Sequence, residues 1–228
     1  MYLQIVMKTI IVPWLGFSAP HPDLTEVSKA LDALGKGHEI STVNWDGYVN
    51  EPAVRFNIGY GDSEIYLKYY VTENFVLAEK DSSNESVCED SCVEFFVSPD
   101  SDGIYYNFEF NPIGTCLLGK GTGRADSKKV DPSYISKIRR MGTMGTMPFS
   151  EKIGEQSWEL TIAIPVEAFA GKEIGRLGGR TFKANFYKCG DKLTQPHYLT
   201  WNPVGTENPD YHRPEYFGEL VFEARKTQ

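Results

Sequence analysis

Residues 87–111 read VCEDSCVEFFVSPDSDGIYYNFEFN, and this stretch predicts a β-hairpin with one buried and one polar face. Its two halves, CVEFFV and YYNFEF, place apolar residues at every second position, which is the side-chain period of a strand. Between them, SPDSDG supplies the proline, aspartates and glycine that accept the backbone angles of a reversal. Pairing the apolar sides puts Glu94, Asn107 and Glu109 on one surface. Three polar groups on a rigid sheet suit a small-molecule site, although an ordinary solvated sheet face shows the same pattern.

Other parts of the chain alternate in the same way and predict the remaining strands. A second hairpin is expected from residues 54–60 and 65–71, joined at Gly61-Asp62. The other expected strands are 158–164, 182–187, 197–202 and 218–222, with a first strand in the opening residues 1–16, where Met7 is a candidate start. Residues 76–89 and 112–147 lack this period and are expected to be mostly irregular connections.

One early segment predicts a helix instead. In residues 23–35 the leucines and Val27 share one face, Asp23 begins the helix and Gly35 ends it, so it should pack on an edge or end of the sheet. Eight to ten short strands, this helix and short helical turns indicate an all-β fold, an antiparallel β-sandwich with Greek-key or jelly-roll connections. We expect one domain over residues 1–228, because sandwiches of about this length are commonly single domains.

Composition narrows the partners and the compartment. The net charge is −8, from 31 acidic against 23 basic residues, and this argues against a nucleic-acid partner. No stretch is long and apolar enough for a membrane span, and the opening residues lack the features of a signal peptide. The four cysteines are too sparse for a disulfide scaffold. We expect a cytoplasmic protein, or a periplasmic or secreted one if the natural N-terminus carries a signal peptide; the oligomeric state is not indicated.

Four motifs carry a family resemblance. They are DSCVEFFV at 90–97, YYNFEFN at 105–111, WELTIAIP at 158–165, and LTWNP followed by RPEYFGELVF at 199–222. Together they resemble carbohydrate-binding module family 9 and the broader DOMON-like β-sandwich group over residues 54–222, in particular stand-alone members from Bacteroides-type gut bacteria. The resemblance implies non-catalytic binding of a sugar or of the end of a glycan chain, in carbohydrate catabolism, with calcium in some members.

The resemblance also implies site residues. Family members clamp a sugar ring between two aromatic side chains, and Trp201 matches the second of these walls. Glu94 matches the family's acidic sugar contact, while Asn107 and Glu109 match polar contacts on the next strand. A flat indole ring would face the C–H side of a pyranose, and the polar groups would bond its hydroxyls.

The first aromatic wall is missing where the family places it, because this chain has Val87 there. Three aromatic residues elsewhere are candidates to replace it: Trp45, Tyr70 and Tyr187. Arg124, after a glycine-rich segment, could reach a sugar hydroxyl or an anionic group, or it could anchor its loop through an acidic neighbour. Together with Asn202, beside Trp201, it completes the predicted ligand-binding residues.

Other functions compete with sugar binding. The carboxylates Glu94 and Glu109 on one face could be the pair of a glycoside hydrolase, although no residue is assigned a catalytic role. The sandwich could also be a protein-interaction or regulatory module that has lost its sugar site. A nucleophile set of Cys189, Asp191 and His197 is conceivable, but a structural thiol is the favoured interpretation.

Metal and haem sites are weaker hypotheses. Cys88 and Cys92, four residues apart, lack the second close pair of a zinc site. His197 and His212 are candidate haem ligands, but a lone histidine more often serves structural hydrogen bonds. Calcium is the cofactor candidate, since the expected loops contain seven acidic residues without EF-hand spacing: Asp62, Asp81, Glu89, Asp90, Asp100, Asp102 and Asp210.

Overall fold

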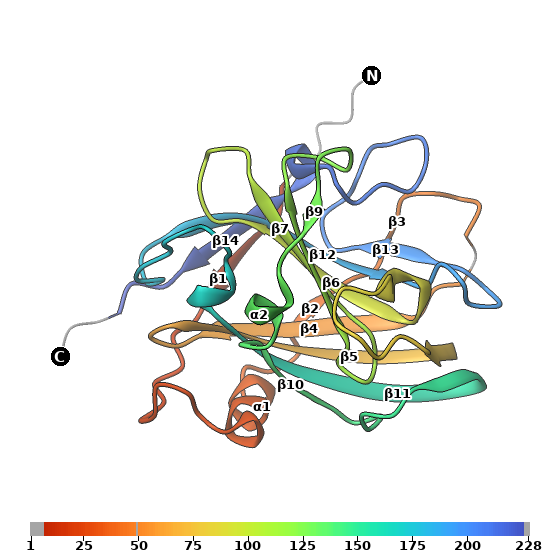
Figure 1. The fold of residues 1–228 in the computed structure, drawn as a ribbon, viewed down its shortest axis with the longest axis horizontal. Coiled ribbons are helices and arrows are strands. Elements are labelled where there is room, and N and C mark those ends of the chain that lie inside the picture. The colour runs from red at the N-terminus through yellow and green to blue at the C-terminus, as the bar shows by residue number, and fades with distance from the viewer. Residues whose placement is uncertain (1–6, 49, 226–228) are drawn as a thin grey trace.

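The computed structural model describes residues 7–48 and 50–225, and these form two β-sheets packed face to face (Figure 1). Within these residues the larger sheet contains nine strands: β1 (Thr9–Val12), β3 (Thr42–Val43), β6 (Cys92–Ser98), β7 (Tyr105–Phe110), β8 (Cys116–Gly121), β9 (Lys128–Lys129), β12 (Thr181–Cys189), β13 (Tyr198–Thr200) and β14 (Gly218–Phe222). The smaller sheet contains five: β2 (His38–Glu39), β4 (Ala53–Tyr60), β5 (Glu64–Ala78), β10 (Arg139–Gly142) and β11 (Phe149–Pro165). The predicted β-sandwich is therefore confirmed.

Strand order explains which side chains become neighbours. The larger sheet runs β1-β14-β12-β6-β7-β8-β9, with β13 paired to β12 and β3 paired to β13, and the smaller runs β10-β11-β5-β4-β2. Pairing is antiparallel except between β1 and β14, which are parallel. The expected first strand is present at β1, and the part of that expectation in residues 1–6 lies outside the described residues.

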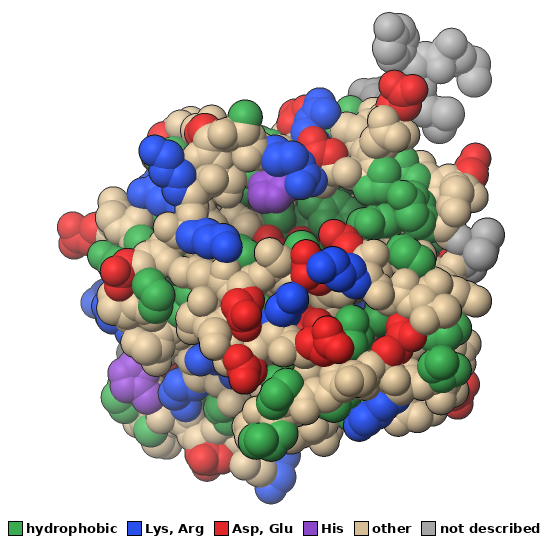
Figure 2. All heavy atoms as spheres, turned by 45° about the vertical axis from the view of Figure 1, so that its right-hand side comes forward, with side chains coloured by type: hydrophobic (Ala, Val, Ile, Leu, Met, Phe, Trp, Pro, Cys, Tyr) green, Lys and Arg blue, Asp and Glu red, His purple; other side chains and the backbone are tan. Residues whose placement is uncertain are grey.

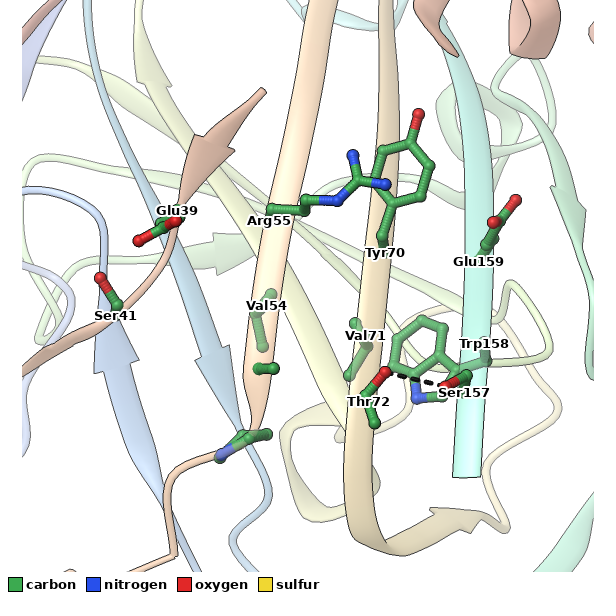
Figure 3. Close-up of a pocket in the computed structure, with 12 residues that line it drawn as sticks. Glu39, Ser41, Val54, Arg55, Tyr70, Val71, Thr72, Ser157, Trp158 and Glu159 are labelled. Atoms are coloured by element: carbon green, nitrogen blue, oxygen red, sulfur yellow. Dashed lines mark hydrogen bonds between the residues drawn. The ribbon is translucent and has the colours of Figure 1, made fainter. Parts of the chain in front are cut away.

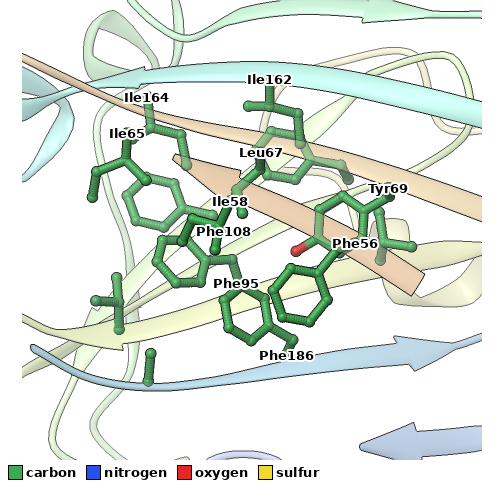
Figure 4. Packing of buried hydrophobic residues seen from close by; sticks show 14 of the residues in the cluster. Phe56, Ile58, Ile65, Leu67, Tyr69, Phe95, Phe108, Ile162, Ile164 and Phe186 are labelled. Carbon is green, nitrogen blue, oxygen red and sulfur yellow. The ribbon is translucent and has the colours of Figure 1, made fainter. Parts of the chain in front are cut away.

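The central hairpin forms as the sequence indicates. Strands β6 and β7 pair antiparallel with Phe95 opposite Phe108 and Glu94 opposite Glu109. The apolar side of both strands enters the main core, where rings from the two sheets interdigitate (Figure 4). Phe186 of β12 bridges the layers, because its ring stacks on Phe56 of the smaller sheet at 3.8 Å and on Phe95 at 5.0 Å. This packing fixes β6, β7 and β12 as a rigid platform.

The predicted helix forms but packs differently from the expectation. Helix α1 (Leu24–Asp32) begins at Asp23, whose side chain accepts a hydrogen bond from the Thr25 backbone N–H at 2.7 Å. It covers the outer face of the smaller sheet rather than an edge or end (Figure 1). The reason is that Tyr66 of β5 and Ala163 of β11 present apolar surface on that face, against which Val27 packs.

Several regular elements lie where irregular structure was expected. Strands β5 and β11 extend beyond the sandwich, and residues 112–147 contain β8, β9, β10 and the short helix α2 (Pro132–Ile135). Register shifts in the β11–β5 pairing near Ile153 interrupt the alternation, so the extension shows no clean period in the sequence. Three 3₁₀ turns complete the described structure: Val87–Glu89, Val166–Ala168 and Pro214–Tyr216. None of the helices in the described ranges is long and apolar enough to cross a membrane.

A buried ion pair connects the two sheets at one end of the core. The Lys188 ammonium of β12 lies 2.9 Å from a Glu73 carboxylate oxygen of β5, and both side chains are fully buried. Trp158 donates its indole N–H to the other Glu73 oxygen at 2.8 Å, and Lys188 also donates to His197 Nε2 at 2.8 Å. Burial lowers the pKa of His197 well below its ordinary value, so this ring is a neutral acceptor. His197 is thus a structural residue and not an available haem ligand.

Candidate functional site

A hollow opens on the outer face of the larger sheet, above β6, β7 and β12. The segment 195–217 and the turn at 87–89 build its walls over the sheet. The hollow has a volume of about 90 Å³. Figure 2 shows this side of the molecule hollowed between hydrophobic, acidic and basic side chains, with a histidine at the rim.

Two carboxylates form the floor of the hollow. Glu94 of β6 and Glu109 of β7 are direct cross-strand partners, and they are only 3% and 6% exposed. Burial, and then the neighbouring charge of Glu109, raises the pKa of Glu94 well above its usual value. Burial also raises the pKa of Glu109 to about 7, against the opposing effect of a hydrogen bond from Asn107. In the described part of the chain, neither carboxylate has a lysine or arginine within ion-pair distance.

Asn107 supports the floor from one side. It is 2% exposed, and its Nδ2 donates to Glu109 Oε1 at 2.8 Å, while its Oδ1 has no partner among the described residues. Asn107 lies opposite Gly119 of β8, where a Cβ would stand 2.2 Å from the Asn107 Oδ1. Glycine at this position therefore leaves the space that Asn107 needs in order to orient Glu109.

Tyr198 supplies the aromatic wall of the hollow. It is partly exposed on β13, and its ring meets Trp45 and Tyr48 edge to face at 6.3 and 4.6 Å. Tyr211, which also lines the hollow, lies 6.3 Å from the Tyr198 ring and is 6% exposed. These neighbours hold the Tyr198 ring in place, so it is a preorganised surface for an apolar or C–H-bearing ligand. Tyr198 is not among the nine residues predicted to bind the ligand.

Arg124 and His212 lie at the rim. The Arg124 guanidinium forms an ion pair with Asp210 at 2.8 Å and is largely exposed, so it both lines the hollow and anchors the 195–217 segment. His212 Nδ1 forms a hydrogen bond with the Tyr105 hydroxyl at 2.6 Å. Burial, and then the charge of Arg124, lowers the pKa of His212 to about 4, so the ring is neutral at pH 7. This histidine, too, is engaged within the protein.

Trp201 does not line the hollow, and its predicted role as a sugar-stacking wall is wrong. Its side chain is 3% exposed and belongs to the main core, where the indole meets the Phe186 ring edge to face at 5.7 Å. A Cβ at Gly218 would lie 2.6 Å from the indole, so glycine is required beside it. The physical reason is strand parity: Leu199 and Trp201 share one side of the strand and its continuation, and that side is the core.

The proposed replacements for the missing wall also lie elsewhere. Trp45 is 6% exposed behind Tyr198, and its indole N–H donates to the Thr206 carbonyl at 2.9 Å. Tyr187 is fully buried and stacks on Tyr211 at 4.0 Å. Tyr70 lies on the outer face of the smaller sheet, and Val87 is completely buried. These aromatic residues therefore give no free ring face to the hollow.

Asn202 is also structural. It is fully buried, its Nδ2 donates to the Tyr216 carbonyl at 2.7 Å, and its Oδ1 accepts from the Lys8 backbone N–H at 2.9 Å. Of the nine predicted ligand-binding residues, the structure brings Glu94, Glu109 and Arg124 together around the hollow, with Asn107 as a support. Cross-strand pairing in the hairpin places Glu94 beside Glu109, whereas Arg124 reaches the hollow from the connection after β8.

A larger groove crosses the outer face of the smaller sheet, between β4, β5 and β11 (Figure 3). It has a volume of about 560 Å³, and Figure 3 shows the Arg55 guanidinium lying over the Tyr70 ring, 3.4 Å from its centroid. Beside them Lys68 forms ion pairs with Asp32 at 2.8 Å and with Glu159 at 2.9 Å. The charges here are satisfied within the protein and the tyrosine face is covered. The smaller hollow is therefore the better candidate site.

The other predicted chemistries find no common site in the structure. The Cys189 thiol donates to Glu94 at 3.0 Å, whereas His197 is bound to Lys188, so the nucleophile set is not assembled. The seven acidic residues considered for calcium lie in four separate connections, and among the described residues no three of them converge on one point. Asp90, for example, accepts from two backbone N–H groups and from Asn111, and the others have basic or hydroxyl partners. Within the described residues these groups do not fit a calcium site.

Comparisons with known proteins agree with this fold. The family model for carbohydrate-binding family 9 matches residues 27–222, a range that includes most of α1. A crystal structure of a candidate carbohydrate-binding protein from Bacteroides uniformis is 41% identical, with a TM-score of 0.91, and covers 96% of this chain and 100% of that one. A search of curated proteins finds no match.

Two more distant structures share the fold. Both are family 9 carbohydrate-binding modules from Caldicellulosiruptor kristjanssonii, one in complex with glucose and one with cellotriose. The glucose complex is 13% identical, with a TM-score of 0.58, and covers 97% of this chain and 98% of that one. The cellotriose complex is 16% identical, with a TM-score of 0.55, covering 96% and 95%. From the family match over most of its length, the chain belongs to carbohydrate-binding family 9.

Proposed function

We propose that the hollow above β6, β7 and β12 binds the terminal ring of a saccharide. The observation that carries this proposal is the pair of buried carboxylates, Glu94 and Glu109, placed opposite each other at the floor without a paired cation. Sugar hydroxyls both donate and accept hydrogen bonds, so they can pair with a carboxylate or with the protonated carboxyl that burial favours at Glu94. Because both carboxylates stand on central strands, little ordering is needed when a ligand binds.

Tyr198 is the proposed stacking surface in place of Trp201. Its ring stands beside the carboxylates and is held by Trp45 and Tyr48. The C–H side of a pyranose would lie against this ring through dispersion and hydrophobic contact. One aromatic wall and one acidic floor give the hollow an apolar and a polar side, as a sugar ring requires.

The size of the hollow favours a chain end over the middle of a chain. Its volume of about 90 Å³ is well below the roughly 300–1,000 Å³ of typical ligand pockets, so only part of one ring can enter it. One ring in the mouth, with its outer hydroxyls reaching down to the floor, fits these dimensions. A chain continuing on both sides of the bound ring would meet the walls. The ligand class proposed is therefore a monosaccharide or an oligosaccharide terminus.

Calorimetric titration with glucose, cellotriose and methyl glucoside tests the proposal. Glu94→Gln should weaken saturable binding by about 2- to 13-fold, the equivalent of losing one hydrogen bond between neutral groups. Glu159→Gln is the matched control, since this carboxylate lies on the outer face of the other sheet, and it should leave affinity unchanged. Equal affinity of wild type and Glu94→Gln would refute the assignment. A broader sugar panel without any binding, from a folded protein, would favour the protein-interaction alternative.

The same carboxylate pair motivates the glycoside-hydrolase alternative. Glu94 and Glu109 are cross-strand neighbours with raised pKa values, and one group that keeps its proton beside another that loses it is what acid–base hydrolysis needs. Membership in a carbohydrate-binding family supports binding over catalysis. A panel of chromogenic glycosides separates the two: turnover that disappears in Glu94→Gln would establish hydrolysis, and inactivity across the panel would leave binding alone.

A further inference from the structure

Two thiols and a carboxylate converge beneath the hollow. Cys92 of β6 lies directly opposite Cys189 of β12, and Glu94 is two residues further along β6, so all three side chains point to the outer face. All three are buried, and their Sγ and carboxylate oxygen atoms lie within 4.8 Å of one another. Both strands have neighbours on each side in the sheet, so the backbone ladder holds the three groups in place.

We propose that Cys92, Cys189 and Glu94 form a binding site for a thiophilic divalent cation, with Zn²⁺ as the occupant. Two thiolates and a carboxylate are ligands that Zn²⁺ accepts together, whereas calcium and magnesium prefer sets made of oxygen alone. Zn–S bonds of about 2.3 Å and Zn–O bonds of about 2.1 Å require Cys189 Sγ and Glu94 Oε1, which are 3.0 Å apart in a hydrogen bond, to separate slightly when the metal replaces the thiol proton.

The electrostatics of the floor favour a cation. Glu94 and Glu109 are both buried, and within the described ranges neither has an ion-paired lysine or arginine. The nearest basic group at the hollow, Arg124, is already paired with Asp210 at 2.8 Å. A bound metal ion supplies the positive charge that a buried carboxyl group needs in order to ionise. On binding, the two thiols lose their protons to the buffer and become thiolate ligands.

The site would be open on one side. Cys189 and Glu94 both line the hollow, so a cation held between them and Cys92 has its fourth coordination position directed at the hollow. Three protein ligands with one free position is the arrangement of zinc sites that exchange a water or ligand. Cys88 and Glu109 stand beside that position on the hollow's wall and floor. The inference needs no sugar and does not depend on the proposed function.

Cys116 provides a matched control within the same chain. It is a buried free thiol like the other two, but it belongs to the main core on the inner side of β8. A metal ion bound by Cys92, Cys189 and Glu94 should not depend on Cys116 for its affinity. Cadmium serves as the probe, because its thiolate complexes absorb in the ultraviolet and report the ligands directly.

The experiment titrates the reduced, chelator-washed full chain with Cd²⁺, following the thiolate charge-transfer band and the heat of binding, with proton release measured in two buffers. Wild type and Cys116→Ala should each bind one equivalent. Cys92→Ala, Cys189→Ala and Glu94→Gln should weaken binding by more than the roughly 10- to 100-fold that loss of a mere supporting contact costs. Thermal unfolding without metal confirms that each variant is folded, and the isosteric variant Glu94→Gln remains a test if an alanine variant is not folded.

Three results would overturn the site. They are absence of the charge-transfer band in wild type, equal weakening in Cys116→Ala and Cys189→Ala, or unchanged affinity and band intensity in Glu94→Gln. Zn²⁺ must also displace Cd²⁺ from the wild-type protein, and failure to do so would contradict the choice of occupant. Sugar titrations repeated in EDTA test the proposed function separately. If the metal-free protein binds sugar, sugar binding does not require the cation, and the cadmium experiment alone decides whether the cation site exists.

Discussion

Substitutions at Trp201 and Tyr198 should have opposite effects on stability and on sugar binding. Trp201 is 3% exposed in the main core, so Trp201→Ala removes a buried indole and leaves a cavity against Phe186. Such a change costs about 3–5 kcal/mol of unfolding free energy. At about 2–4 °C of melting temperature per kcal/mol for a chain of this size, the expected loss is about 6–20 °C. Trp201→Phe keeps a ring in the core and should cost less, about 1–3 kcal/mol.

Sugar affinity should depend on Tyr198 and not on Trp201. Tyr198 is partly exposed at the hollow, so Tyr198→Ala should cost little stability but weaken binding about tenfold or more, in proportion to the lost contact with a ring. Trp201→Phe, which remains folded, should bind with wild-type affinity because its side chain does not reach the hollow. Urea unfolding and calorimetric titration of both variants measure the two quantities side by side.

The refuting result is specific. If Trp201→Phe is folded and loses sugar affinity more than tenfold while Tyr198→Ala retains it, the sugar contacts the indole, and the placement of the ligand at the hollow is wrong. A loss of stability in Tyr198→Ala as large as that in Trp201→Ala would contradict the burial argument for the same pair.

Three further perturbations test other parts of the structure. The pKa of His212 is about 4 in the folded protein against an ordinary 6.5, so the contribution of this residue to the unfolding free energy is complete above pH 6.5 and is lost as pH falls toward 4. The loss is up to about 3 kcal/mol, at roughly 1.4 kcal/mol per pH unit. Urea midpoints at pH 7 and 4.5 should therefore differ less in His212→Gln than in wild type, and an equal difference would argue against this role of His212. Lys188→Met leaves the buried Glu73 charge unpaired and should cost about 3–5 kcal/mol, much of it recovered when Glu73→Leu is added, as chemical unfolding of the single and double variants would show. Gly119→Ala places a Cβ 2.2 Å from the Asn107 Oδ1 and should weaken sugar binding by displacing the support of Glu109; calorimetry that finds wild-type affinity would show that Asn107 does not act through Glu109.

The parts of the fold that the sequence predicts well are those where the two faces of a strand differ. In the hairpin of β6 and β7, residues such as Phe95 and Glu94 alternate without interruption, so the pattern determines strand, face and partner together. Placing Glu94 beside Glu109 required nothing beyond this pairing. The same holds for β4 and for the first half of β5.

The parts that the sequence does not predict depend on tertiary contacts. Strand β11 runs through register shifts near Ile153, where alternation fails although pairing with β5 continues. Helix α1 lies on the outer face of the smaller sheet because the Tyr66 side chain presents apolar surface there. From the sequence alone, this residue cannot be distinguished from a tyrosine exposed to solvent.

The error at Trp201 shows how a motif can outweigh a simpler signal. In the segment YLTW, Leu199 and Trp201 share parity, and the same rule that located Glu94 would have directed the indole to the core and Tyr198 outward. The prediction for Trp201 followed the match to the family's aromatic wall instead of strand alternation. The loop at 203–217, whose Tyr211 completes the hollow, carries no period, so its position over the sheet could not be derived from the sequence.

The most direct test of the account is the position of a bound sugar in a crystal structure of the complex with cellotriose. The account predicts a terminal ring in the hollow, against Tyr198, with hydroxyls within hydrogen-bond distance of Glu94 and Glu109. Density for the sugar in the groove beside Arg55, with the hollow empty, would contradict it.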